Sequence, residues 1–451
     1  MSAADKPQLA PVTWGQALRF WFKLGCISFG GPAGQIAIMH RELVEQRRWI
    51  SEQRFLHALN FCMLLPGPEA QQLATYLGWL MHRTWGGVAA GLLFVLPSLA
   101  LLIGLSGAYM VFGTTPWLEA VLWGVKPAVA ALVLQAVYRI GSRTLRTPRR
   151  APLLWAIALL SFVAVALVQV PFPAVVLAAA LIGAVAQRFW PGQFANGGAH
   201  GPAASTHNLD STPFWIGDDT APPAHARFTK VRLVRVLAVG AALWLLPMAA
   251  LMAVWGWDGT LTRMAWFFTK AALLTFGGAY AVLPYVYQGA VDQFGWLSAA
   301  QMMDGLALGE TTPGPLIMVV AFVGFVGGWG QAVLGSGSLL WGATLAAVVV
   351  TWFTFLPSFV FILAGGPFIE STHGKLQFTA PLTAITAAVV GVIASLGVFF
   401  VLHIAYPRGP AAGLDVAALG LATAAAYALI RRGWGVVPVI AACAAMGWAW
   451  R

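Results

Sequence analysis

An internal repeat is the feature that most constrains what this chain can fold into. Phe29-Gly30-Gly31 returns 247 residues later as Phe276-Gly277-Gly278, and Pro66-Gly67-Pro68 returns at the same spacing as Pro313-Gly314-Pro315. Both copies place helix-breaking residues inside very apolar sequence. Repeats whose hydrophobic segments are interrupted at matching positions are typical of secondary transporters, and the interruptions indicate where the solute binds.

The composition is that of a membrane protein. Hydrophobic residues make up 59% of the 451 residues and charged residues only 9%, whereas an average soluble domain carries about 25% charged residues. Apolar runs of about 18 residues or more recur along nearly the whole chain, which is the length that a membrane-spanning helix needs. We therefore expect an all-α polytopic membrane protein that is in contact with the lipid bilayer.

Charge and special residues exclude several other classes. The net charge of +11 arises from basic residues in short loops between apolar segments, which the positive-inside rule explains without a nucleic-acid partner. The three cysteines form no CxxC pair and the eight histidines are scattered, so we expect neither a disulfide nor a metal site. Residues 1–13 are polar and show no cleavable signal peptide.

The chain divides into four parts. The first two apolar segments of each repeat are broken near their middle, so neither can continue as one regular helix. We expect each repeat to form two broken, re-entrant hairpins followed by spanning helices. A segment rich in Gly, Ala, Pro, Ser and Thr separates the repeats, and we expect a flexible cytoplasmic linker there. The predicted parts are the first repeat (1–190), the linker (191–230), an extra spanning helix (231–259) and the second repeat (260–451).

Loop charges favour opposite orientations of the two repeats. The loop between the broken segments of the first repeat carries four arginines within residues 41–54, whereas the matching loop at 288–300 carries no Lys or Arg. If the broken segments are hairpins, the basic loops at 41–54 and 139–150 both face the cytoplasm. The extra helix then makes the second repeat begin outside. We therefore predict an inverted repeat about a pseudo-two-fold axis in the membrane plane.

The first break of each repeat is suited to an anion. Lys23 and Lys270 each lie six residues before a break, where a buried ammonium costs about 2.5–3.5 kcal/mol and needs an anionic partner unless it snorkels to the interface. The glycine pairs permit positive φ, and each helix that restarts after a break offers free N–H groups. Ser28 and Thr275 add hydroxyl donors. Alternatively, the glycines serve only tight helix packing.

Carboxyl groups flank the second breaks. Glu69 follows Pro68 and Glu310 precedes Thr312, and burial in the membrane favours the protonated carboxyl, so both are candidates for proton coupling. Lys126 is a further candidate for a buried cation, and Asp304 is either its counterpart of opposite charge or an interfacial residue. The predicted substrate-binding residues are Lys23, Ser28, Phe29, Gly30, Gly31, Pro32, Pro66, Gly67, Pro68, Lys270, Thr275, Phe276, Gly277, Gly278, Thr312, Pro313, Gly314 and Pro315.

These motifs together resemble the chromate ion transporter family in its long, two-domain form. In that family a domain with a Phe-Gly-Gly-Pro segment and a downstream Pro-Gly-Pro occurs once or twice. The match extends over essentially the whole chain, but the second half departs at Ala279, where the proline is absent, so the two half-sites need not be identical. The resemblance implies a secondary transporter in the bacterial inner membrane that exports chromate and confers chromate resistance.

The residues alone leave alternatives open. Sulfate is a tetrahedral dianion of similar size and is the natural competitor, so the same fold could serve a sulfate or other oxyanion importer, or an uncoupled anion channel. No nucleophile–base pair, P-loop or nucleotide fingerprint is present. We therefore expect no enzyme activity, no catalytic residue and no cofactor, and transport driven by an ion gradient or by the membrane potential. The oligomeric state stays open, with a homodimer among the alternatives.

Overall fold

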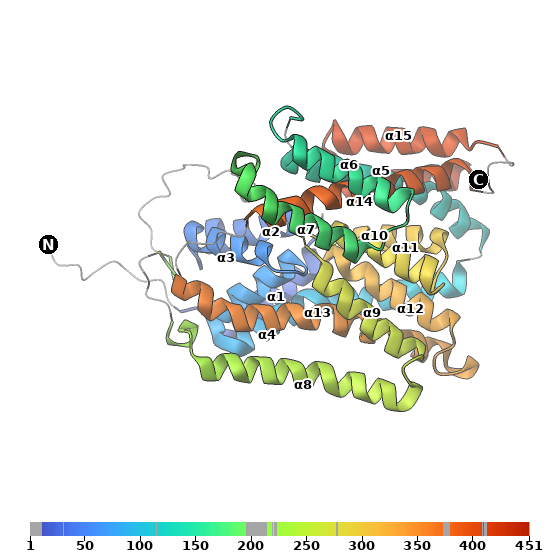
Figure 1. Ribbon diagram of the computed structural model, residues 1–451. Helices are drawn as coiled ribbons and strands as arrows, with labels where there is room; N and C mark the ends of the chain where they lie inside the picture. Colours follow the sequence, from blue (N-terminus) through green and yellow to red (C-terminus); the bar gives the residue numbers. More distant parts are fainter. Residues whose placement is uncertain are drawn as a thin grey trace.

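The protein is a bundle of helices in the computed structural model, most of which run along one common axis (Figure 1). The structure describes residues 11–450 except 30, 114, 146, 195–213, 219, 221–222, 277, 373–378, 408 and 410–412. Within these residues, six helices are long and apolar enough to cross a bilayer, which confirms an all-α polytopic architecture. They cover Glu69–Phe112, Pro116–Thr144, Phe172–Phe189, Lys230–Trp255, Ser336–Glu370 and Ala380–Ala405.

The first repeat begins with a hairpin of two short helices, α1 (Trp14–Ile27) and α2 (Gly31–His40). At 1.5 Å per residue, neither reaches across a hydrocarbon core of about 30 Å. The chain reverses between them, because Lys23 before the break forms an ion pair with Glu42 after it, at 3.4 Å. The two short helices therefore form a hairpin where the sequence predicted one.

A second hairpin follows, formed by α3 (Glu52–Leu64) and the start of α4 (Glu69–Phe112). At His82 and Arg83 the backbone of α4 leaves helical geometry. The rest of α4 then runs back along its own first turns, because a Cβ on Gly78 would lie 2.5 Å from the Cβ of Ala90. The spanning part of α4 thus starts close to residue 86.

The remaining elements complete the two repeats and the helix between them. The first repeat continues with η1 (Arg41–Gln46), α5 (Pro116–Thr144), α6 (Pro152–Ala166), α7 (Phe172–Phe189) and η2 (Pro191–Gln193). Then come η3 (Ala224–Ala226) and α8 (Lys230–Trp255). The second repeat contains α9 (Thr260–Leu274), α10 (Ala279–Tyr287), η4 (Gln288–Gln293), α11 (Ala299–Thr311), η5 (Leu316–Met318), α12 (Val319–Gly330), η6 (Ser336–Ser338), α13 (Leu339–Thr372), α14 (Thr379–Ala405), α15 (Val416–Ile430) and α16 (Val436–Trp450).

The second repeat copies the hairpins of the first in detail. The Phe20 and Trp49 rings meet edge to face with centroids 5.3 Å apart, and Phe267 and Trp296 meet in the same way at 5.6 Å. The members of each pair are 247 residues from their counterparts. The same spacing relates the two π-helical turns η1 and η4. The sequence repeat is therefore a structural repeat.

The two sets of hairpins enter the molecule from opposite ends. Arg232, near the start of α8, donates to Thr84 at 3.4 Å, so α8 starts beside the turn that leads into the spanning part of α4. Its 26 residues reach about 39 Å along the edge of the molecule (Figure 1). His82, beside the same turn, contacts the carbonyl of Val12 just before α1 at 2.9 Å, so α1 starts at the same end as α8 and α9 begins at the other end.

The described part of the linker is docked on the first repeat. Ile216 forms an isolated β-bridge with Ile50, and the Ser51 hydroxyl donates to Asp218 at 2.5 Å. His225 contacts the Trp79 carbonyl at 3.0 Å. The expectation of a flexible linker is therefore wrong for residues 214–218 and 223–229, because their own polar groups bind the hairpin loops; residues 195–213 lie outside the described range.

Candidate functional site

The four breaks meet in the middle of the molecule. The N–H of Gly67 donates to the carbonyl of Thr275 at 2.8 Å, and the N–H of Gly314 donates to the carbonyl of Ser28 at 2.8 Å. Each bond joins the second break of one repeat to the first break of the other, and the two bonds connect equivalent positions. The region that they define, residues 28–32, 65–69, 275–279 and 312–315, is called the break junction below.

Two serines of spanning helices pack against the junction. A Cβ on Gly314 would lie 2.6 Å from the Cβ of Ser98, and a Cβ on Gly67 would lie 2.3 Å from the hydroxyl of Ser358. Neither serine was among the residues predicted from the sequence. Each ends a Leu-Pro-Ser segment, at 96–98 and 356–358, but these segments are 260 residues apart, so a comparison at the fixed spacing of 247 does not align them.

Unpaired polar atoms gather at the junction. Gln72 donates to the Pro66 carbonyl at 2.8 Å, and Gln35 donates to the carbonyls of Ser28 (3.4 Å) and Gly314. Several polar side-chain atoms there are buried, yet they have no hydrogen-bond partner among the described residues: Ser28 Oγ, Ser98 Oγ and the Oε1 atoms of Gln35, Gln71 and Gln72. Buried polar groups are normally paired, so the junction retains hydrogen-bonding capacity for a polar ligand.

Both predicted carboxyl groups lie at the start of α10. The Tyr280 hydroxyl donates to Glu310 at 2.5 Å, and Glu69 Oε1 lies 3.8 Å from where a Cβ on Gly278 would be. The guanidinium of Arg139 on α5 interacts electrostatically with both glutamates. A helix N-terminus carries partial positive charge, so these carboxyl groups occupy the kind of position that an anionic ligand would take.

The predicted hydroxyl donors differ between the repeats. The Thr275 hydroxyl donates to the Ala271 carbonyl of its own helix at 2.7 Å, and the Thr312 hydroxyl donates to the Gly309 carbonyl at 3.1 Å. Only the Ser28 hydroxyl of this set has no partner in the described part of the chain. The first repeat therefore offers the free donor, in keeping with the expected difference between the half-sites.

The backbone of the first breaks has the predicted freedom. Gly31 and Gly278 adopt φ values of +71° and +98°, which L side chains rarely take, while Gly30 and Gly277 lie outside the described residues. Phe29 is 39% exposed, whereas Phe276 is partly buried. The motif prolines stand at or next to the breaks, as predicted: Pro32, Pro66, Pro68, Pro313 and Pro315.

The two predicted lysines have their contacts with residues outside the break junction. The Lys23 side chain is 55% exposed and pairs with Glu42, and the Lys270 ammonium lies 5.8 Å from the ring centroid of Trp266. Burial raises the pKa of the Glu42 carboxyl, but the hydrogen bond from Arg47 and the charges of Lys23 and Arg47 outweigh it, so the pKa lies below its ordinary value. Because each ammonium is stabilised locally, we no longer assign either one to the site.

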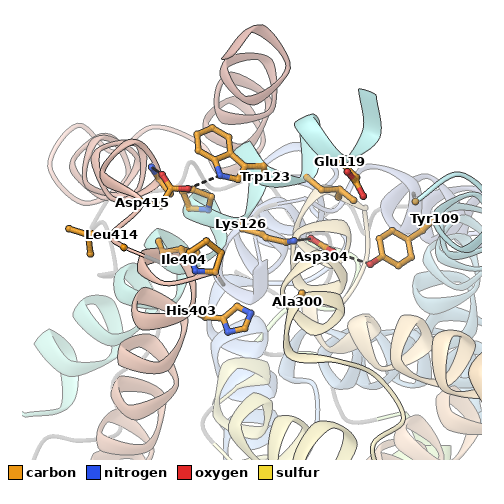
Figure 2. Close-up of a pocket in the computed structure, with 16 residues that line it drawn as sticks. Tyr109, Glu119, Trp123, Lys126, Ala300, Asp304, His403, Ile404, Leu414 and Asp415 are labelled. Atoms are coloured by element: carbon orange, nitrogen blue, oxygen red, sulfur yellow. Dashed lines mark hydrogen bonds and ion pairs between the residues drawn. The ribbon is translucent and has the colours of Figure 1, made fainter. Parts of the chain in front are cut away.

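A polar cavity of about 530 Å³ lies at the end of the molecule opposite the linker. Figure 2 shows Lys126 pointing towards Asp304, with their charged atoms 3.8 Å apart, and the Tyr109 hydroxyl donating to the same carboxylate at 3.0 Å. Trp123 donates to Asp415 at 3.0 Å across the cavity. Asp304 is therefore the counter-charge of Lys126.

A second charged network lies near the linker. Glu370 on α13 pairs with Arg54 at 3.5 Å and accepts a hydrogen bond from Tyr76 at 2.6 Å. Like the Asp304 network, it joins a carboxylate of the second repeat to side chains of the first. Neither Tyr76 nor Tyr109 was predicted from the sequence, because each tyrosine and its carboxylate belong to different repeats and share no local motif.

Two broken-helix units that meet at a buried polar junction, surrounded by spanning helices, define the architecture of a membrane transport protein. A family model described as chromate transporter matches residues 15–184 and 262–448, which covers both repeats. The chain therefore belongs to the chromate transporter family and is a multi-pass bacterial membrane protein.

Named relatives agree with this assignment. The chromate transport protein of Pseudomonas aeruginosa is 34% identical over 445 residues, which cover 97% of this chain and 92% of that protein. The chromate transport protein of Cupriavidus metallidurans is 30% identical over 394 residues, or 87% of this chain and 84% of that protein. The probable chromate transport protein of Synechococcus elongatus is 29% identical over 380 residues, or 84% and 82%. No solved structure matches the chain.

Proposed function

We propose that this protein is a secondary transporter that exports chromate from the bacterial cytoplasm and so confers chromate resistance. The observation that carries the proposal is the break junction, where crossed hydrogen bonds of Gly67 and Gly314 hold four helix breaks around unpaired buried polar groups. Relatives named as chromate transport proteins, at 30% and 34% identity, support chromate as the solute. The proposed arrangement in the membrane is an inverted repeat with parts 1–190, 231–259 and 260–451.

The junction suits a small tetrahedral dianion. The restarting helices α2 and α10 present their positive ends there, and the hydroxyls of Ser28 and Ser98 can donate to its oxygen atoms. Strong hydrogen bonds to a charged acceptor offset the cost of removing the dianion from water. We keep the motif residues at the breaks as the proposed binding residues, remove Lys23 and Lys270 from the set, and add Ser98 and Ser358.

Proton coupling follows from competition at α10. Glu69 and a bound oxyanion would occupy the same place at the start of α10, so one excludes the other. In the empty carrier the partly exposed Glu69 carboxyl carries a proton, because a carboxylate with little access to water is costly. When an oxyanion binds from the cytoplasm, it displaces Glu69 towards water, where the carboxyl releases its proton. One proton thus enters on the return step for each oxyanion that leaves, with Glu310 as the second candidate.

Reconstitution in proteoliposomes tests this function. With the voltage clamped to zero, an imposed pH gradient should drive labelled chromate, and a pH-sensitive dye should report proton movement in the opposite direction. The Glu69→Gln variant should keep exchange of chromate for chromate but lose the response to the pH gradient, whereas the exposed Glu45→Gln control should keep both. Flux that follows voltage alone would identify a channel, and preferential uptake of sulfate would favour the importer.

A further inference from the structure

We propose that the cavity around Asp304 is the entry site for protons from the outer side, and that a buried polar path along α4 and α11 leads from it to the break junction. The ligand of this site is the proton, delivered by water, and the oxyanion does not pass through it. This inference rests on the proposed proton-coupled transport and names the route that such coupling needs.

Asp304 has the geometry of a proton acceptor. Its side chain is only 3% exposed, yet it lines the cavity (Figure 2). Tyr109 donates to Oδ2, but Oδ1 has no hydrogen bond within the described residues, since the Lys126 ammonium is 3.8 Å away. A proton that binds at Oδ1 therefore displaces no hydrogen bond and replaces the ion pair with Lys126.

The charges that face Asp304 favour a proton over an oxyanion. Lys126 and the exposed Glu119 lie on α5. His403 lies on α14, and Asp415 lies on the segment before α15. Asp415 is held by Trp123 and also accepts from the N–H of Ala418 at 2.9 Å. Three carboxyl groups therefore face one lysine and one histidine. Such a lining attracts cations and repels a dianion.

A carboxyl group marks each end of the path. Asp304 and Glu310 are both buried on α11, six residues apart, which corresponds to a rise of about 9 Å. Asp304 faces the cavity, and Glu310 is bonded to Tyr280 at the start of α10, where Glu69 also lies. The helix thus carries one titratable group at the cavity and one at the junction.

Hydroxyl groups on α4 connect the same two places. Tyr109 lies at the cavity, Ser98 lies against Gly314 at the junction, and Ser106 lies between them on the helix. At about 100° per residue, Ser98 and Tyr109 share one face of α4 and Ser106 is about 80° from Ser98. Both serine hydroxyls are fully buried and have no partner in the described part of the chain. Hydroxyls donate and accept, so with intervening water they can pass a proton inwards.

Two transport assays on the reconstituted full chain test the route. Asp304→Asn should lower chromate flux driven by a pH gradient by at least about tenfold, as expected when a proton-transfer group is removed. Exchange of chromate for chromate at equal pH moves no net proton and should stay near the wild-type rate. The control is Asp258→Asn, because Asp258 is exposed in the loop before α9 and lies outside the cavity.

Each outcome decides the matter. Wild-type flux in Asp304→Asn under the pH gradient would overturn the proposal, and so would equal loss of both activities in a folded protein. If Asp304→Asn does not fold, Ser106→Ala replaces it, because its hydroxyl has no partner to lose in the described structure. Ser106→Ala should slow only the proton-driven flux, and normal flux would overturn the path. Absence of chromate flux in the wild type would instead refute the proposed function.

Discussion

Single glycines decide whether the breaks of the two repeats can pack against each other at the junction. Gly314 has a φ of +108°, and a Cβ there would lie 2.6 Å from the Cβ of Ser98. A side chain at this position therefore meets a backbone penalty and a steric one, and the clash falls on a spanning helix rather than on a flexible side chain.

We expect Gly314→Ala to destabilise the protein by about 1–3 kcal/mol, because alanine disfavours this φ and would push Ser98 away. Thermal unfolding in detergent measures the effect. The matched control is Gly104→Ala on α4, where nothing lies within 4 Å of the added Cβ, so its melting temperature should not fall. Equal melting of Gly314→Ala and wild type would contradict the crossed packing.

Between elements, ion pairs hold the two repeats together. Arg54 on α3 and Glu370 on α13 are 13% and 8% exposed. Glu370→Gln would leave the largely buried Arg54 guanidinium without its counter-charge. Breaking such a buried pair lowers the free energy of unfolding by about 3–5 kcal/mol. We expect a clear drop in melting temperature. Arg263→Gln is the control, since its partner Asp258 is 84% exposed and exposed pairs contribute at most about 1 kcal/mol. Similar small shifts in both variants would show that the Glu370 pair adds little.

Residues 223–229 of the linker should separate from the first repeat in acid. Burial lowers the pKa of His225 from an ordinary value of about 6.5, so the undocked state binds a proton more readily than the docked state. Docking then has its full stability above that ordinary value and loses it as the pH falls through the lower, docked value. Hydrogen exchange of residues 223–229, corrected for intrinsic rates, should accelerate on acidification. The acceleration should be absent in His225→Gln, and its persistence there would assign it to another group.

At the scale of the whole molecule, the sequence predicted the repeat, the hairpins and the polar breaks, because helix breakers at one fixed spacing are local signals. It did not predict which way Lys23 and Lys270 face, since one residue of rotation on a short helix separates a buried position from an exposed one. Ser98 was not predicted because insertions after the hairpins change the spacing between equivalent residues of the two repeats. The bonds of Glu370 and Asp304 join different repeats, and no local pattern encodes such pairs.

We propose that two equivalent hairpin units enter from opposite sides of the membrane and meet at their breaks. Gln46 and Gln293 are equivalent, exposed positions in the loops of the two units, and each can be changed to cysteine after the three native cysteines are replaced. In intact cells a membrane-impermeant maleimide should label Gln293→Cys directly and Gln46→Cys only after the membrane is permeabilised. Labelling of both from the same side would contradict the account.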